Sequence, residues 1–443
     1  MALDVSPFAD ESHRVPDHDS APVLGHQAGS PACRRVVGAL FAAGMATFAL
    51  LYSTQALLPA LAQEFGVSTA QSTLSMSVTT LGLGLALLVA GPLSERVGRT
   101  RLIHVSLIAS GVVALVCALA PTWHVLLGLR LLQGFTLAGL PAVATAYLRE
   151  ELHPSTHARA AGLYIGGTAL GGMVGRLVTG PIGELAGWRA ALAAAAAIGL
   201  GCALVVRLLL PPSQNFTPAP SGRRAMLDMS RRALRDPGLL ALYGIGGCGI
   251  GALVAVFNTV GFRLTAAPLH LGLGAASLVF LVYPLGSISS AVFGRLADAY
   301  GRRAVLPVGC AIAVAGVLIT LLPGLPAVIV GLALLTIGFF AVHGVASGWV
   351  PVRAHAGGVA SGQAASFYLF VYYMGASVFG SLAGRAWSSA GWPAVAALAV
   401  GLLGLAALIA LRLTRIPSLI VPRADQGHGV TGALTEPAEL RGA

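Results

Sequence analysis

Twelve long apolar runs divide this chain of 443 residues. Each run holds 18 or more residues with few charges and lies between charged or Pro- and Gly-rich segments. A helix needs about 20 apolar residues to cross the hydrocarbon core of a bilayer. The expected fold class is therefore an all-α membrane protein with twelve transmembrane helices. Their approximate limits are 36–58, 73–93, 102–120, 124–148, 159–183, 188–210, 239–262, 275–297, 304–322, 326–350, 358–384 and 392–413.

Composition supports a membrane protein and excludes several other classes. Only 10% of residues are charged and the mean hydropathy is +0.82, far from a soluble average. The net charge of +11 is scattered over short loops, so we expect no nucleic-acid partner. The five cysteines are isolated, so neither a disulfide framework nor a metal site is expected, and no cofactor. No ATP-binding loop and no nucleophile–base pair are present, which argues against a pump or an enzyme.

The chain is predicted to consist of two similar six-helix halves. Residues 211–238, rich in Pro and Arg, form the only long internal break, which we interpret as a cytoplasmic linker between 36–210 and 239–413. Residues 1–35 and 414–443 are expected to be cytoplasmic tails, the first of them disordered. Because each half holds an even number of spans, both insert in the same orientation around an axis along the membrane normal, with a substrate cavity between them near the midplane. Equivalent positions lie 204 apart: Gly134 and Gly338, Tyr164 and Tyr368, Gly171 and Gly375, Gly187 and Gly391.

Arginine distribution predicts the orientation. With the N-terminus inside, 22 of the 27 arginines fall in cytoplasmic segments and only Arg189, Arg263 and Arg385 fall on the other side. The positive-inside rule therefore places both termini in the cytoplasm. The N-terminal segment lacks a basic region leading into a short apolar core, so we expect no cleavable signal peptide.

A short charged turn occurs once in each half. Residues 91–101 read GPLSERVGRTR and residues 294–303 read GRLADAYGRR. In both turns two glycines stand seven apart, an acid precedes the second glycine and arginines follow it. The first glycine would let a helix end approach its neighbour, the acid would pair or cap at a helix terminus, and the arginines would hold the loop at the cytoplasmic face. The residues assigned to gating are Gly91, Glu95, Gly98, Arg99, Asp298, Gly301 and Arg302.

These two turns resemble the signature loop of the major facilitator superfamily, between helices 2 and 3, and its weaker repeat between helices 8 and 9. Glu95 stands where the family more often has Asp. The resemblance covers roughly residues 34–415. The segments GLYIGGTALGGMVGR and GFFAVHGVASGW look most similar to the YnfM-like bacterial inner-membrane permeases. The resemblance implies a multi-pass transporter in a bacterial cytoplasmic membrane.

Two arginines lie inside predicted spans. Arg130, followed by Gln133 and Gly134, matches the arginine of the family's helix-4 motif, which the family links to proton coupling or to holding the helix. The alternative is an arginine that reaches the outer interface. Gly162, Gly171 and Gly175 match the glycine spacing of the antiporter motif, where helices pack closely. That motif expects Pro next, and Arg176 stands there instead, which suggests a contact to an anionic or polar substrate, or else an arginine that reaches headgroups.

Further polar residues lie in the C-terminal half. His343 is near mid-span and titrates in the range that suits proton exchange, although a neutral histidine bonded between helices is an equal alternative. The residues expected to line the cavity with Arg176 and His343 are Gln55, Asn258, Tyr368, Tyr372 and Tyr373.

None of the 16 acids falls at the middle of a span. A cavity edged by arginine and histidine and lacking acids should favour neutral polar or anionic solutes. The leading hypothesis is a monomeric secondary transporter, an antiporter for proton-linked efflux, whose partners are a small-molecule substrate, protons and membrane lipids. The alternatives are an importer of an organic anion and, from another class, a non-transporting membrane sensor.

The arginine bias makes a topology prediction. Reporter fusions placed after Arg235 and after Arg415 should both report the cytoplasm. A periplasmic signal from either fusion would contradict the twelve-span topology.

Overall fold

A computed structural model describes residues 25–216, 223–417 and 419. Regular structure in these residues is almost entirely helical. The helices of the first half are α1 Pro31–Tyr52, η1 Gln55–Leu57, α2 Leu58–Phe65, α3 Thr69–Ser72, α4 Leu74–Val97, α5 Arg99–Cys117, α6 Trp123–Leu137, α7 Gly139–Glu151, η2 Pro154–Thr156 and α8 His157–Leu209. Those that follow are α9 Arg223–Ala233, α10 Pro237–Thr265, α11 Leu273–Ser277, η3 Leu278–Val282, α12 Tyr283–Tyr300, α13 Arg302–Ile319, α14 Leu325–Ala356 and α15 Ser361–Leu413.

Ten helical segments among the described residues are long and apolar enough to cross a membrane. Two of them, α8 and α15, are 53 residues long, about twice a bilayer crossing. Each bends near its middle, at Gly187 with φ 82° and at Gly391 with φ 65°. Left-handed φ values suit glycine because it has no Cβ. The predicted twelve spans therefore correspond to eight single segments and two bent pairs.

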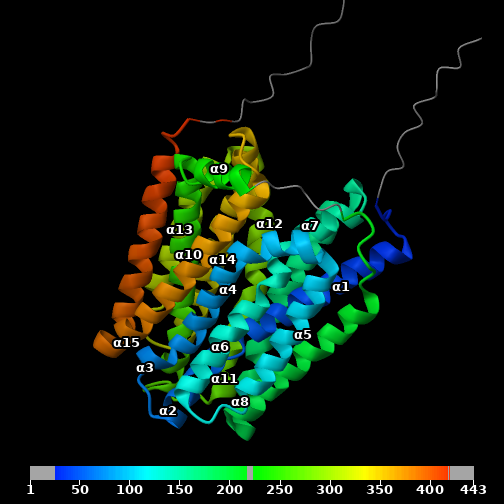
Figure 1. The fold of residues 1–443 in the computed structure, drawn as a ribbon. Helices are drawn as coiled ribbons and strands as arrows, with labels where there is room; N and C mark the ends of the chain where they lie inside the picture. The colour runs from blue at the N-terminus through cyan, green and yellow to red at the C-terminus, as the bar shows by residue number, and fades with distance from the viewer. Residues whose placement is uncertain (1–24, 217–222, 418, 420–443) are drawn as a thin grey trace, which may run out of the picture.

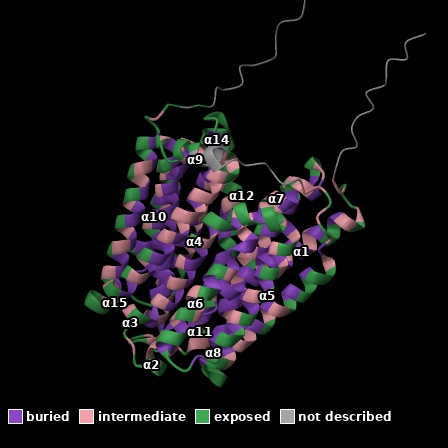
Figure 2. Cartoon of the chain, viewed as in Figure 1, coloured by how far each residue is buried: buried purple, intermediate pink, exposed green. Residues whose placement is uncertain are grey.

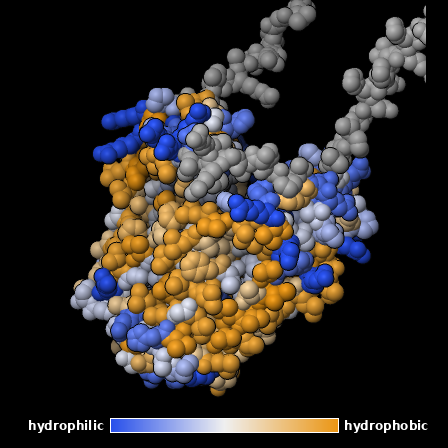
Figure 3. Space-filling model, in the orientation of Figure 1, coloured by the Kyte–Doolittle hydropathy of each residue, from blue (hydrophilic) through white to orange (hydrophobic). Residues whose placement is uncertain are grey.

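The spans form two bundles that lean against each other (Figure 1). Buried residues fill the interior of the bundles and exposed ones lie on their outer faces (Figure 2). A broad hydrophobic surface covers the middle of the visible face, with hydrophilic residues toward both ends (Figure 3). We call the end that carries α9 and residues 211–216 the linker end, and the end that carries α2, α3 and α11 the far end. The helices of the two halves diverge toward the linker end (Figure 1).

One boundary prediction needs correction. Within the predicted N-terminal tail, 1–35, the described residues 25–35 are structured rather than disordered. His26 pairs with Leu152, and α1 begins at Pro31, where Ser30 caps the first turn. Residues 1–24 lie outside the described residues, as do residues 418 and 420–443 of the C-terminal tail. The predicted linker, 211–238, contains the basic helix α9 at residues 223–233.

Glycines allow close packing of α8 against α1. A Cβ on Gly167, Gly171 or Gly175 would collide with the backbone of α1 at Phe41, Met45 and Ala49, respectively. The three glycines stand four residues apart and so form one stripe along the helix. Gly162, predicted to pack in the same way, is exposed and has nothing within 4 Å, so that assignment is wrong in this conformation. Gly167 takes its place, because it lies one turn from Gly171 on the same face.

Contacts between the halves gather at the far end. Gly180 of α8 packs on Ser277, and Gly384 of α15 packs on Thr73 and Ala70. At the linker end, Gly91, Gly162 and Gly294 each face open space. The described structure is thus closed between the halves at the far end and separated at the linker end.

The stripe predicts a contrast between two glycines of one helix. Gly171→Val should lower the free energy of unfolding by about 2 kcal/mol or more, since overpacking against a backbone cannot relax easily. Gly162→Val, which places the same side chain in open space, should leave the unfolding temperature of the purified protein unchanged. Equal losses would show that the α1–α8 contact does not depend on Gly171.

Candidate functional site

Arg130 closes a break in the first span. Helix α1 ends at Tyr52, and the chain continues through Ser53 and a short 3-10 turn before α2 begins. The Arg130 guanidinium donates to two carbonyls in the last turn of α1, those of Leu50 at 3.3 Å and Leu51 at 2.9 Å. It also donates to Ser75 O at 3.3 Å and to Gln133 Oε1 at 2.5 Å. A cation at the carboxyl end of a helix is further stabilised by the helix dipole.

Arg130 is 1% exposed, so the alternative of an arginine that reaches the interface is wrong in this structure. Gln133 belongs to the same cluster, as its place in the motif suggested. Arg130 therefore links α6 to the carboxyl end of α1 and to the start of α4.

Arg176 is enclosed at the far-end side of the bundle centre. The side chain is fully buried. Its Nε donates to Gln55 Oε1 at 2.5 Å, Nη1 donates to Gly172 O at 2.6 Å, and Nη2 donates to the Tyr283 hydroxyl at 3.1 Å. The headgroup alternative is therefore wrong, and so is a guanidinium directly exposed in a cavity in this conformation.

Three aromatic rings surround the same guanidinium. Its central carbon lies 3.9 Å from the ring centre of Tyr52, 4.3 Å from that of Tyr283 and 4.9 Å from that of Phe280. Cation–π attraction is strongest where water is excluded. Among the described residues, every hydrogen-bond and ring partner of Arg176 is neutral, so the positive charge of this side chain is not cancelled locally.

The predicted cavity residues Gln55 and Asn258 meet in the centre of the molecule. Gln55 Nε2 donates to Asn258 Oδ1 at 2.6 Å, and both residues are buried. Gln55 belongs to the first half and Asn258 to the second, so this bond crosses between the halves.

His343, Tyr368 and Tyr372 form a second cluster on α14 and α15. The His343 Nδ1 lies 2.9 Å from the Tyr368 hydroxyl. The imidazole stacks on Phe339 and lies 4.8 Å from the Tyr372 ring. His343 and Tyr372 are half-buried, whereas Tyr368 is buried. The predicted hydrogen bond between helices is present, and the imidazole retains partial exposure in mid-bundle.

Sequence reasoning missed Tyr52, Phe280 and Tyr283. These aromatics lie in apolar runs, where most rings only pack, so composition offered no signal for them. Tyr52 stands three residues before Gln55, and that short spacing was the one available hint.

The first charged turn is held by ion pairs. Gly98 has φ 91°, which permits the sharp connection between α4 and α5. Arg99 is buried, pairs with Glu95 at 2.5 Å and Glu150 at 3.1 Å, and donates to the Ser94 hydroxyl. Glu150, absent from the sequence-based assignments, joins α7 to this turn.

The first glycine of that turn behaves differently from the prediction. Gly91 has nothing within 4 Å, so it supports no close helix approach here. The halves diverge at this end, which removes the surface that Gly91 would face.

The second charged turn has the same backbone conformation at its glycine as the first turn, but its acid does not form the corresponding ion pair. Gly301 has φ 87°, close to Gly98. Asp298 is exposed and forms no ion pair among the described residues, and Arg302 begins α13. Arg303 instead donates to the carbonyls of Thr414 and Ile416.

An ion pair outside the turns anchors the second half. Arg353 Nε donates to Asp236 Oδ1 at 2.7 Å, and Asp236 also caps α10 by accepting from Leu239 N. Burial alone would raise the pKa of the Asp236 carboxyl, but the bonds from Arg353 and Leu239 outweigh it and lower the pKa below its usual value.

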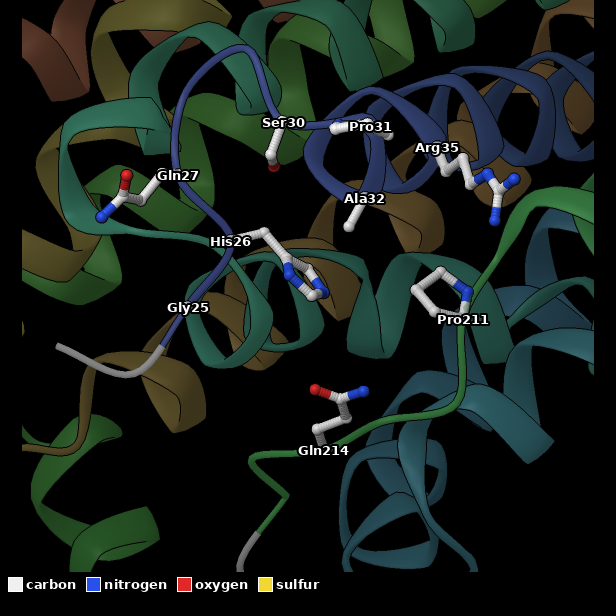
Figure 4. A pocket seen from close by; sticks show the side chains of 9 residues that line it. All are labelled: Gly25, His26, Gln27, Ser30, Pro31, Ala32, Arg35, Pro211 and Gln214. Carbon is white, nitrogen blue, oxygen red and sulfur yellow. The ribbon is translucent and has the colours of Figure 1, made fainter. Parts of the chain in front are cut away.

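Two pockets lie away from these clusters. One, of about 860 Å³, opens at the far end between the halves and includes Gln63, Glu184, Phe262 and Trp387. The other, of about 660 Å³, lies at the linker end, where His26 and Arg35 face residues 211 and 214 (Figure 4). It is formed by the first half and the linker only, so it is not a passage between the halves.

The comparisons with known proteins agree with this architecture. The model of the Major Facilitator Superfamily matches residues 39–368. This chain belongs to the major facilitator superfamily. It is 41% identical to the uncharacterised MFS-type transporter YybF of Bacillus subtilis, over 87% of this chain and 94% of that one. It is 40% identical to the inner membrane transport protein YnfM of Escherichia coli, over 87% and 92% of the two chains.

A solved structure confirms the fold. A bacterial homologue of the human lysosomal transporter Spinster, in an inward-facing and occupied conformation, superposes with a TM-score of 0.69 at 16% identity, covering 87% of this chain and 98% of that one. The predicted similarity to YnfM-like permeases is confirmed, and this facilitator is a membrane transport protein. In such transporters the site between the halves binds a small molecule.

The Arg130 cluster generates a stability prediction. Arg130→Met should lower the free energy of unfolding by about 3 kcal/mol, because a buried cluster of carbonyl oxygens and the Gln133 amide oxygen lose the hydrogen bonds from the guanidinium. Arg130→Lys should recover only part of that loss, since an ammonium lacks the planar fork that reaches carbonyls from two helices. Thermal unfolding of the purified variants measures both, and full recovery by lysine would contradict the fork geometry.

Proposed function

We propose that this facilitator is a secondary active transporter that moves a small anionic or polar solute out of the cell in exchange for protons. The observation that carries the proposal is the buried, uncompensated charge of Arg176. Its partners are an amide, a backbone carbonyl and a phenol, all neutral. Together with Arg130, it makes the far-end side of the bundle centre electropositive, and a low-dielectric surrounding extends that field.

The neighbouring surface suits a solute with an apolar or aromatic body. Tyr52, Phe340, His343 and Tyr372 are half-buried in the middle of the spans. Tyr372 and His343 contact each other. Phe339 contacts both of them and also contacts Phe340, which packs on Tyr283. Rings of this kind bind flat or apolar groups, while the arginine field orients the charged end.

We assign the linker end to the cytoplasm, on the arginine distribution, and the far end to the outside. The described conformation is then inward-open, and transport rocks one half against the other. In the outward-open state the linker end closes, and Gly91, Gly162 and Gly294 would supply the close contacts they lack here. Glu95, Gly98 and Arg99, with Asp298, Gly301 and Arg302 in the second turn, would then act on gating.

His343 is the proposed site of proton exchange. It is the histidine of the half-buried aromatic cluster, and its Nδ1 lies within hydrogen-bond distance of the Tyr368 hydroxyl. Arg130 and Gln133 hold the helices around the centre and complete the coupling region.

Matched acids and amides test the substrate class. Purified protein should be stabilised against thermal unfolding by carboxylates, such as benzoate, more than by their amides, such as benzamide. Arg176→Gln should weaken carboxylate binding about tenfold or more and leave amide binding unchanged, since a charge-assisted hydrogen bond is worth about 1.5–3 kcal/mol. Equal losses for both, or none, would mean that Arg176 is structural only.

Proton exchange has its own readout. In everted membrane vesicles with an acidified lumen, a carboxylate that stabilises the protein should discharge the pH gradient. His343→Gln should abolish this discharge while binding persists. If the His343→Gln variant discharges the pH gradient as fast as the wild type does, His343 takes no part in proton coupling.

A further inference from the structure

A hydrogen-bond chain joins the two halves at their shared axis. Arg176 of the first half donates to Tyr283 of the second, and Gln55 of the first donates to Asn258 of the second. Gln55 and Asn258 lie 203 positions apart, the same offset that separates Gly91 from Gly294. They therefore stand at nearly corresponding places in the two halves, and the bond between them crosses from one half to the other. Both hydrogen bonds can form only when the two halves are in contact at the far end.

The charge of Arg176 determines the direction of the chain. A guanidinium only donates, so Gln55 must turn its Oε1 toward Arg176 and its Nε2 toward Asn258. Asn258 must then accept through Oδ1, and its Nδ2 has no partner among the described residues. The position of the guanidinium therefore affects both hydrogen bonds between the halves. It forms the bond to Tyr283 directly, and it orients the Gln55 amide that donates to Asn258.

The guanidinium is shielded unequally. Tyr283 and Phe280 are buried, but Tyr52 is half-buried and lies 3.9 Å from the guanidinium carbon. A solute in the bundle centre would therefore approach Arg176 from the side that Tyr52 covers. A carboxylate there would form charge-assisted hydrogen bonds, about twice as strong as those from neutral oxygens.

We propose that the Tyr283–Arg176–Gln55–Asn258 chain is the latch of the far-end closure, and that the anionic group of the solute releases it. The carboxylate takes the guanidinium from Gln55 and Tyr283, so both bonds across the axis weaken together. The release step rests on the proposed function, because it needs an anionic solute, whereas the latch itself does not. A solute bound from the linker end would then open the far end.

Distances across the far end test the latch without any ligand. The five native cysteines are buried, so spin labels can be attached at Gln63→Cys and Ala266→Cys, on opposite halves. Tyr283→Phe and Gln55→Met each remove one bond across the axis. Each should raise the fraction of molecules with a wide far end about fivefold to tenfold. Tyr243→Phe is the matched control and should leave the distance distribution unchanged, since the buried Tyr243 hydroxyl has no hydrogen-bond partner in the described part of the chain.

A fourth variant acts in the opposite direction. Asn258→Asp keeps the shape, removes the unpartnered N–H and makes the bond from Gln55 charge-assisted. It should narrow the distance distribution, which keeps the latch testable if the loosened variants unfold. Benzoate should widen the far end of the wild type, benzamide should not, and Asn258→Asp should reduce the effect of benzoate.

The outcomes separate the latch from the substrate class. Wild-type distances in both Tyr283→Phe and Gln55→Met would overturn the latch, whatever benzoate does. Widening in those variants, with benzoate bound but without effect on the wild type, would overturn the release step. Failure of every carboxylate to bind would overturn the proposed function, and the ligand-free distances would still decide the latch.

Discussion

A buried positive charge without a negative partner is the constraint on which the centre of this transporter depends. Such a charge persists inside a membrane only if oxygen atoms surround it. The break after Tyr52 supplies carbonyls to Arg130, and the short turn that follows positions Gln55 for Arg176. One irregularity in the first span therefore serves two arginines from two other helices.

The same constraint explains why the halves meet where they do. Arg176 uses one oxygen from its own helix, one from α12 in the other half and one from η1. Moving the halves apart at the far end would remove the Tyr283 oxygen and leave a donor to be satisfied by water or by a solute. The contact between the halves at the far end therefore also supplies one of the oxygen atoms that stabilise the Arg176 guanidinium.

The ion pairs at the linker end have a different effect. Arg99 ties α5 to α4 and α7, and Arg353 ties α14 to the start of α10. Each pair lies within one half, so it stiffens that half without holding the halves together. The two copies of the charged turn have also diverged, since Arg99 is buried and paired while Asp298 is exposed. This arrangement leaves the linker end free to open.

Sequence by itself determined the spans, the duplication and the family. Hydrophobicity over about 20 residues and a repeated turn are local properties, and the membrane forces them into helices. Sequence also identified Arg130, Arg176, Gln55 and Asn258 as polar residues in apolar runs. Only the tertiary structure decided what they contact. Bonds from Arg176 to Tyr283 and from Gln55 to Asn258 join residues more than 100 positions apart, so spacing carries no signal for them. The exposure of Gly91 and Gly162 likewise depends on how the two halves pack, because neighbours along the chain do not determine which surface a glycine faces.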